Sequence, residues 1–277
     1  MSVENGKKYQ INIGEDTRVF FITLPKNYDN TKPYKLLVAL HSYGATAEDL
    51  VHHAANDVFP SPYYGQQLLD SNGNYIFVAP AADGGLWTKG EKDHRFVDET
   101  ITALFDNYCV DTTRVFATGF SMGAQIAYSL AQDLQERFRA VVTYAVADYN
   151  IWIPASVSNP GRYGAKELPV AWMNVQGKND ERHDYSRAKN SALPRILKKN
   201  LKADADPDNL ERPLEISGNT GHVCHDFETT DPRFPIKWCS WPGGHQWTAH
   251  DTGNMSVGWG WEDTWVPAEV HAFLEQF

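Results

Sequence analysis

Short runs of apolar residues recur along the chain, separated by polar and glycine-rich stretches. Continuous apolar runs of strand length are typical of strands that are buried on both faces of a sheet. Segments with helical periodicity fill several of the gaps between the runs. This order predicts an α/β fold with a mostly parallel central sheet flanked by helices. The runs span residues 36–40, 75–79, 115–118, 140–145, 170–175 and 236–241.

The N-terminal region follows a different pattern. Residues 8–13 and 18–24 alternate apolar and polar side chains, and Gly14, Glu15 and Asp16 stand between them. Alternation with a period of two on both sides of a glycine-containing turn predicts an antiparallel hairpin.

Three other segments complete the expected architecture. Residues 101–108 and 266–277 place apolar side chains at i, i+3, i+4 and i+7, which is typical of helices with one buried face. Residues 147–168 show no clean period, contain Pro154 and Pro160, and are longer than an ordinary connection. We expect this last segment to be a lid or pocket wall, and the alternative is a packed surface loop.

Composition and charge bear on the number of domains, the kinds of partner and the location of the protein. The chain has 277 residues, of which 42% are hydrophobic, so residues 1–277 are expected to form a single domain around one large core. The formal net charge is −10 and no basic stretch exceeds Lys198-Lys199, which argues against a nucleic-acid partner. The sequence contains no run of about 18 apolar residues, which is the length that would predict a membrane span. Residues 1–8 lack the apolar centre of a signal peptide, and we expect a secreted chain whose signal has been removed.

The most informative motif is Gly119-Phe120-Ser121-Met122-Gly123, which has the pattern G-x-S-x-G. It follows a predicted strand and precedes a helix start rich in small residues. A sharp strand-to-helix turn of this kind lifts a serine hydroxyl above the sheet, and glycine is needed where the backbone packs closely. Ser121 is therefore the predicted nucleophile, and the predicted fold is that of an α/β-hydrolase.

A nucleophilic serine needs a histidine base and a carboxylate that orients it, in the chain order Ser, Asp or Glu, His. Asp180 follows the predicted strand 170–175 and a glycine loop, and Asp184 is the reserve. His245 follows the last predicted strand and two glycines, which leave it room to reach Ser121. The other downstream histidines lack this placement; those considered are His222, His225, His250 and His271.

The tetrahedral intermediate needs two backbone N–H donors, one after the nucleophile and one in the loop after the early strand. Met122 supplies the first. For the second we favour Tyr43 in the loop His41-Ser42-Tyr43-Gly44, with Ser42 as the alternative.

The chain contains three cysteines, Cys109, Cys224 and Cys239. No two of them have the short spacing of a metal site, and neither a metal nor another cofactor is predicted. Cys224 and Cys239 would close a loop of about 15 residues worth about 3 kcal/mol as a disulfide. Reduced, buried thiols are the alternative, and the state of Cys109 stays open.

Three stretches together carry a family resemblance, namely residues 40–44, 108–123 and 243–247. From about residue 36 onward the chain resembles the feruloyl esterases and related acetylxylan esterases of carbohydrate esterase family one, and more distantly the polyhydroxybutyrate depolymerases. The resemblance implies a secreted serine esterase that removes phenolic or acetyl esters from plant xylan. It also implies that Cys239 pairs with an upstream cysteine, and we predict the partner to be Cys224.

The leading function is therefore release of ferulate or another hydroxycinnamate from feruloylated arabinoxylan. Acetylated polysaccharide or polyester hydrolysis is the alternative within enzymes. A non-catalytic carbohydrate-binding protein on a hydrolase fold is the alternative from another class, and the nine tryptophans would suit it. Trp87, Trp152 and Trp247 are candidate substrate contacts, although each could equally belong to the core. The oligomeric state stays open.

Overall fold

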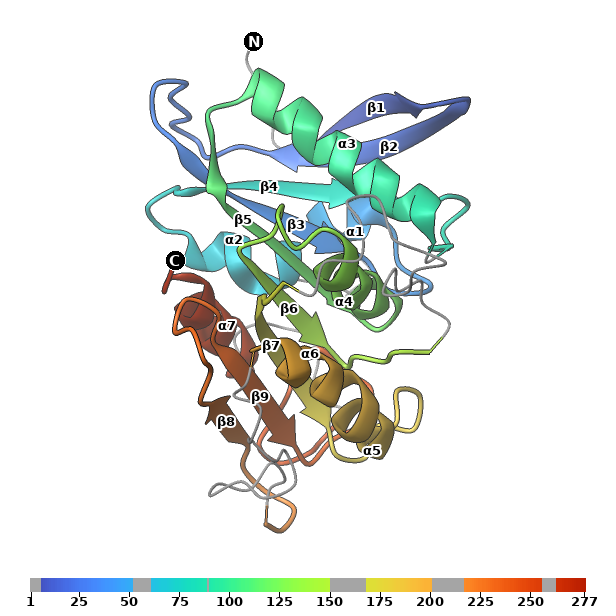
Figure 1. The fold of residues 1–277 in the computed structure, drawn as a ribbon, viewed down its shortest axis with the longest axis vertical. Coiled ribbons are helices and arrows are strands. Elements are labelled where there is room, and N and C mark those ends of the chain that lie inside the picture. Colours follow the sequence, from blue (N-terminus) through green and yellow to red (C-terminus); the bar gives the residue numbers. More distant parts are fainter. Residues whose placement is uncertain (1–5, 52–60, 89, 150–167, 201–216, 256–262) are drawn as a thin grey trace.

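The computed structural model describes residues 6–51, 61–88, 90–149, 168–200, 217–255 and 263–277. Within these ranges, nine strands form one sheet in the order β1-β2-β4-β3-β5-β6-β7-β9-β8 (Figure 1). The strands are β1 (Lys7–Ile13), β2 (Asp16–Thr23), β3 (Tyr34–Leu40), β4 (Tyr75–Pro80), β5 (Val110–Phe120), β6 (Ala140–Tyr144), β7 (Ala171–Gly177), β8 (Val223–Phe227) and β9 (Ile236–Trp241).

The six central strands β4, β3, β5, β6, β7 and β9 are mutually parallel. Each apolar run identified in the sequence lies in one of them to within one residue at its ends, which confirms the predicted mostly parallel sheet. β1 and β2 form the expected antiparallel hairpin at one edge, and β2 pairs antiparallel with β4. The hairpin turn is shorter than predicted, because Asp16 already pairs with Ile13 and only Gly14 and Glu15 lie between the strands.

Successive side chains of a strand point to opposite faces, so each central strand contributes to two cores. In β3, Leu36, Val38 and Leu40 belong to the core on one face, whereas Leu37 and Ala39 belong to the core on the other. All five are fully buried. This is why β3 has an uninterrupted apolar sequence rather than an alternating one.

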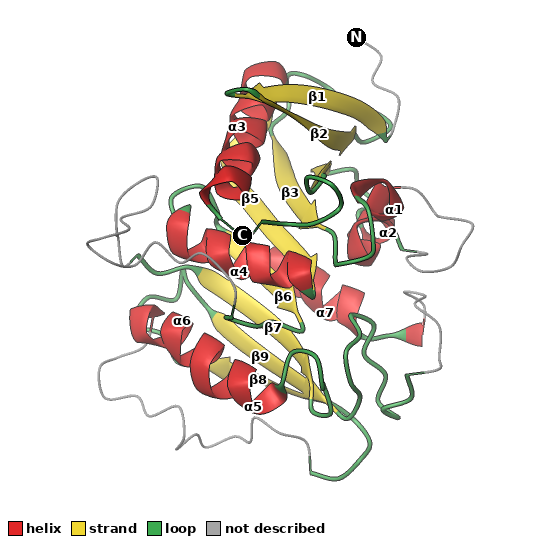
Figure 2. Cartoon of the chain, turned by 90° about the vertical axis from the view of Figure 1, so that its right-hand side faces the viewer, coloured by secondary structure: helices red, strands yellow, loops and turns green. Residues whose placement is uncertain are grey.

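Helices cover both faces of the sheet (Figure 2). α3, α4 and α6 lie over one face, and α1, α2 and α7 lie over the other. α3 and α7 are the two helices predicted from apolar spacing, although they end at Asn107 and Leu274, before the predicted limits. The helical elements are α1 (Ala47–Val51), η1 (Pro62–Gly65), α2 (Gln66–Leu69), α3 (Glu91–Asn107), α4 (Met122–Asp133), α5 (Tyr185–Arg187), η2 (Ala188–Ala192), α6 (Leu193–Asn200) and α7 (Val266–Leu274). None of the helices within the described ranges has the length and apolarity that a membrane crossing requires.

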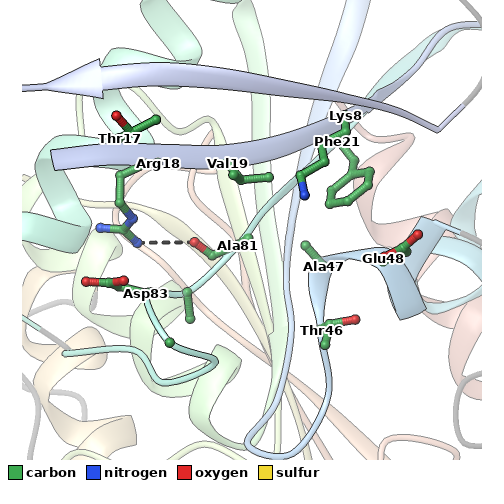
Figure 3. Close-up of a pocket in the computed structure, with 12 residues that line it drawn as sticks. Lys8, Thr17, Arg18, Val19, Phe21, Thr46, Ala47, Glu48, Ala81 and Asp83 are labelled. Carbon is green, nitrogen blue, oxygen red and sulfur yellow. Dashed lines mark hydrogen bonds between the residues drawn. The ribbon is translucent and has the colours of Figure 1, made fainter.

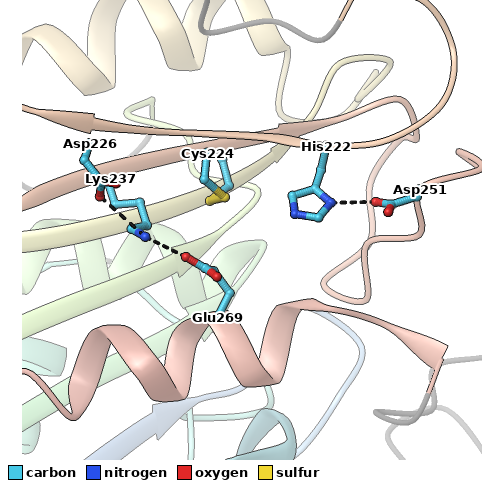
Figure 4. Close-up of a disulfide and its surroundings, with 7 residues drawn as sticks. His222, Cys224, Asp226, Lys237, Asp251 and Glu269 are labelled. Atoms are coloured by element: carbon cyan, nitrogen blue, oxygen red, sulfur yellow. Dashed lines mark hydrogen bonds and ion pairs between the residues drawn. A yellow bond between two sulfur atoms is a disulfide. The ribbon is translucent and has the colours of Figure 1, made fainter. Parts of the chain in front are cut away.

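The strand β8 was not predicted from the sequence. It is a short edge strand, and it pairs antiparallel with β9 so that Cys224 faces Cys239. Their sulfurs are bonded, with the two Cα atoms 4.0 Å apart, which confirms the predicted Cys224–Cys239 disulfide (Figure 4). Beside it, the Lys237 ammonium bonds Glu269 of α7 at 2.6 Å and Asp226 of β8 at 3.4 Å. The pairing with β9, the disulfide and the Lys237–Asp226 ion pair attach the edge strand, and the Lys237–Glu269 ion pair joins β9 to α7.

Candidate active site

The parallel strands end at one edge of the sheet, and the candidate site is built there. β5 leads directly into Ser121, β7 into the loop that carries Asp180, and β9 into the loop that carries His245. β3 ends at the same edge and leads into His41. Loops at the carboxyl ends of parallel strands are where α/β sheets place their binding and catalytic groups.

Ser121 occupies the sharp turn between β5 and α4. Its backbone angles are φ 56° and ψ −117°, a conformation that residues with a side chain rarely adopt. The turn is tight enough that a Cβ atom on Gly119 would clash with the Gly123 carbonyl, and one on Gly123 would clash with the Leu40 carbonyl. The Ser121 N–H donates to the Tyr144 carbonyl oxygen at 3.1 Å. The two glycines of the motif thus allow the close approach of β5, α4 and the end of β3.

The structure brings together the three residues selected from the sequence. The distance from Ser121 Oγ to His245 Nε2 is 2.8 Å, and His245 Nδ1 lies 2.8 Å from Asp180 Oδ2. Asp180 is 3% exposed, and its Oδ1 accepts the backbone N–H groups of Arg182 and His183. These bonds hold the carboxylate toward the imidazole, which is the arrangement that keeps a proton on Nδ1 and leaves Nε2 free to accept one from serine.

The reserve carboxylate and the competing histidines lie elsewhere. Asp184 caps α5, where its side chain accepts the Arg187 N–H. His222 bonds Asp251 at 2.6 Å beside the disulfide, as Figure 4 shows. The others are buried or face different elements, with His225 in β8, His250 buried after the β9 loop and His271 near Gln66 of α2.

The loop after β3 lies against the serine turn. Met122 is the first residue of α4, a position at which a backbone N–H has no partner within its helix. The His41 ring is fixed on both sides, because Nε2 accepts the Ala82 N–H at 3.1 Å and Nδ1 donates to the Ser42 carbonyl at 2.9 Å. Burial lowers the pKa of His41 and keeps this ring neutral. The loop that carries Ser42 and Tyr43 is thereby anchored beside Ser121.

Known proteins share both the sequence and the fold. The chain is 30% identical over 234 residues to feruloyl esterase C of Emericella nidulans, covering 82% of this chain and 76% of that protein. The chain belongs to the feruloyl esterase family. It is also 25% identical over 280 residues to feruloyl esterase D of Neurospora crassa, covering 100% of this chain and 88% of that one. No protein-family model matches the chain.

Solved structures show the same fold. An acetyl xylan esterase from Aspergillus awamori aligns with a TM-score of 0.55 at 14% identity, over 87% of this chain and 94% of that structure. The fold of this feruloyl esterase family member is therefore that of the α/β-hydrolase esterases.

The structure corrects two of the predicted substrate contacts. Trp87 is 2% exposed, and its indole N–H donates to the His41 carbonyl at 2.9 Å. Trp247 is fully buried and packs edge-on against Tyr64. Both indoles therefore support the site from the core and do not line a surface that substrate can reach. Trp152 lies outside the described residues, as do residues 150–167 of the candidate lid.

Tyr64 supports the site in a way that the sequence did not reveal. It is fully buried, and its hydroxyl donates to the Leu40 carbonyl at 2.8 Å while accepting the Phe120 N–H at 3.2 Å. Burial raises its pKa, so the hydroxyl keeps its proton. Leu40 and Phe120 are the last residues of β3 and β5, so one side chain bonds the two strand ends that lead into the 41–44 loop and Ser121.

His183 is a second supporting residue that was missed. Its ring packs against the His245 ring at 70°, with the centroids 4.8 Å apart, and its Nδ1 donates to the Ala145 carbonyl. The Gln176 amide donates to the His183 carbonyl at 2.7 Å, which ties this residue to β7. No sequence signal pointed to His183, because its contacts with His245 and Ala145 join segments that are distant along the chain.

The described side chains show no group of three or more His, Cys, Asp or Glu that could hold a metal ion.

Proposed function

We propose that this chain is a secreted serine esterase that releases hydroxycinnamates such as ferulate from plant cell-wall polysaccharide. One observation carries the proposal, namely the continuous line from Ser121 Oγ through the His245 ring to Asp180, with 2.8 Å at each step. Membership of the feruloyl esterase family supports the choice of a hydroxycinnamoyl ester on a polysaccharide as the proposed substrate. The secreted location rests on the same likeness.

In the first half of the reaction, Ser121 Oγ attacks the ester carbonyl carbon while its proton passes to His245 Nε2. The carbonyl oxygen gains negative charge, which the N–H groups of Met122 and of Tyr43 or Ser42 stabilise. Asp180 stabilises the imidazolium that forms. The intermediate collapses when the C–O bond to the sugar breaks and the sugar oxygen takes the proton from Nε2.

In the second half, water replaces the sugar. His245 accepts a proton from the water, whose oxygen attacks the acyl carbon of the acyl-Ser121 intermediate. Collapse returns the proton to Ser121 Oγ and releases the carboxylic acid. The same residues and the same oxyanion donors therefore serve both halves.

The decisive variant is Ser121→Ala, assayed with methyl ferulate. Loss of the nucleophile is expected to lower kcat by about 10⁴-fold or more, since triad members act as a unit. The folded fraction, followed by circular dichroism and thermal unfolding, should be retained. Activity above about a tenth of wild type in a folded variant would contradict the assignment.

The acyl specificity needs a separate comparison. A feruloyl group has an aromatic ring and a propenyl spacer to bury, and aromatic contact adds about 0.5 to 1.5 kcal/mol to area burial. We therefore expect at least about tenfold higher kcat/KM for feruloyl than for acetyl esters with matched alcohols. Equal or better acetyl turnover would reject the feruloyl specificity and favour an acetylxylan esterase.

A further inference from the structure

A cavity of about 300 Å³ lies beside the carboxyl end of β4 (Figure 3). Three segments enclose it: the β1–β2 hairpin, the start of α1 and the loop after β4. Its volume is at the lower end of the range for small-molecule sites. The polar side chains that line it include Lys8, Thr17, Arg18, Thr46, Glu48 and Asp83.

The cavity adjoins the candidate active site. In the sheet, only β3 separates β4 from β5, so the ends of β4 and β5 are about 10 Å apart at the usual strand spacing. The two sites also share structure, because the N–H of Ala82 in the cavity wall bonds the His41 ring. Thr46, on the opposite wall, follows the oxyanion loop in sequence. The cavity and Ser121 therefore lie at the same edge of the sheet, with the end of β3 between them.

One wall of the cavity is rigidly held. The Arg18 side chain is 6% exposed and donates to the Ala81 carbonyl at 3.2 Å and to Asp93 at 3.0 Å. Figure 3 shows it pointing from β2 toward the loop after β4. Its charge is paired with Asp93, so it does not make the cavity a site for anions.

Three charged groups at the rim have no partner among the described residues. Lys8, Glu48 and Asp83 are exposed, and none of the three side chains bonds or ion-pairs with another described residue. An ammonium group donates hydrogen bonds and carboxylates accept them. The Thr17 hydroxyl donates to Asn12 and the Thr46 hydroxyl donates to Asp49, so toward a ligand these oxygens are acceptors. Two unpaired carboxylates against one ammonium disfavour an anionic ligand. A neutral ligand with several hydroxyl groups matches this set of donors and acceptors.

We propose that the cavity is a glycan subsite, which binds a neutral sugar residue of the polysaccharide that carries the scissile ester. The proposal rests on the proposed esterase function and adds to it a second contact with the same substrate. Binding there would stabilise the complex with a feruloylated oligosaccharide and would do nothing for a simple alkyl ester.

The test compares KM for two substrates, methyl ferulate and a feruloylated arabinoxylo-oligosaccharide. Asp83→Ala and Glu48→Ala remove hydrogen bonds to a charged group, and each should raise KM for the oligosaccharide about tenfold. Thr17→Trp places an indole in the cavity and should have at least the same effect. All three should leave methyl ferulate kinetics within about twofold of wild type. Glu15→Ala, an exposed acidic residue at the hairpin turn, is the matched control and should change neither substrate.

A second measurement does not depend on turnover. An unesterified arabinoxylo-oligosaccharide is titrated into the inactive Ser121→Ala protein, and adding Asp83→Ala should weaken binding about tenfold. Unchanged KM and unchanged binding in the cavity variants would overturn the subsite and leave the esterase standing. Equal losses on both substrates would also overturn it. If wild type failed to hydrolyse methyl ferulate, the proposed function itself would be wrong.

Discussion

The Ser121 backbone holds a conformation that favours glycine, with φ 56° and ψ −117°. Strain of this kind costs about 1 to 3 kcal/mol and is tolerated where it serves a site. At this position it lifts the hydroxyl out of β5 toward His245. The backbone conformation of Ser121 therefore lowers the stability of the fold and at the same time positions the hydroxyl for the proposed chemistry.

A glycine at position 121 should relieve this strain. Ser121→Gly loses the strain of about 1 to 3 kcal/mol, and the added freedom of the unfolded chain offsets only about 0.4 to 1 kcal/mol. We expect Ser121→Gly to have a free energy of unfolding about 1 kcal/mol higher than Ser121→Ala, with both inactive. Urea unfolding of the two variants measures the difference. A less stable glycine variant would show that the turn is unstrained.

The two nearby carboxylates allow a matched comparison of role. Asp180 is buried against His245, whereas Asp184 is the N-cap of α5. Asp180→Asn should lower kcat by about 10⁴-fold, because an amide no longer holds the proton on Nδ1 of the base. Asp184→Asn should change little, because asparagine caps helices as well as aspartate. Steady-state kinetics decide between them, and the opposite ranking would mean that the acid is misassigned.

At the scale of elements, the site depends on how closely β3, β5 and α4 approach one another. The Leu40 and His41 carbonyls lie where a Cβ on Gly123 would have to sit. The Tyr64 hydroxyl bonds the last residue of β3 and the last residue of β5. Ser121, the proposed nucleophile, and the loop proposed to supply an oxyanion donor are therefore positioned by one shared packing arrangement.

Gly123→Ala should disrupt this arrangement. The added methyl group must displace the backbone of β3, and overpacking of this kind costs about 1 to 3 kcal/mol or more. We expect a lower thermal midpoint together with a large loss of kcat. Gly90→Ala is the control, since its Cβ would meet nothing closer than 3.9 Å. Equal effects of the two substitutions would refute the close-approach argument.

His41 should make the stability of this element depend on pH. Burial holds its pKa below the ordinary value of 6.5, so the unfolded chain binds a proton there more readily than the folded chain does. Stability is fully present above pH 6.5 and falls as the pH drops through that value. Protonation would also remove the acceptor that Ala82 uses.

The measurement is urea unfolding from about pH 7 to about pH 5. His41→Gln keeps an acceptor for the Ala82 N–H but does not titrate, so the loss of stability across this range should be smaller than in wild type. An identical slope in the two proteins would show that His41 does not contribute.

At the scale of the whole molecule, the sheet ends at β8, which is attached to β9 by its antiparallel pairing, the disulfide and the Lys237–Asp226 ion pair. β9, its partner, leads into the His245 loop. The edge of the sheet and one member of the proposed triad are therefore structurally linked.

Removing the disulfide should lower global stability. The bond closes a loop with a sequence separation of 15, and Cys224→Ser should lower the free energy of unfolding by about 3 kcal/mol. Cys109→Ser is the matched control and should have a much smaller effect, because Cys109 is free and only partly buried. Thiol titration of the unfolded protein should find one thiol before reduction and all three cysteines after it. Three thiols before reduction would exclude the bridge.

Much of the framework could be read from the sequence because it depends on near neighbours in the chain. Strands buried on both faces have continuous apolar sequences, so the six central strands could be predicted. The turn at Ser121 needs glycine two residues before and after it, so this serine could be predicted from the motif. Asp180 and His245 followed from their positions after the ends of two predicted strands.

The remaining features depend on contacts between segments that are far apart in the chain. Trp87 and Trp247 were candidates for substrate contact or for the core, and only packing shows that they are buried. Tyr64 and His183 gain their roles from strand ends and loops that meet only after folding. β8 is recognisable only by its pairing with β9, and the cavity beside β4 exists only between three folded segments. Local pattern thus determined the sheet and the order of the reacting groups, whereas tertiary packing decided which side chains support them and which surface the substrate can reach.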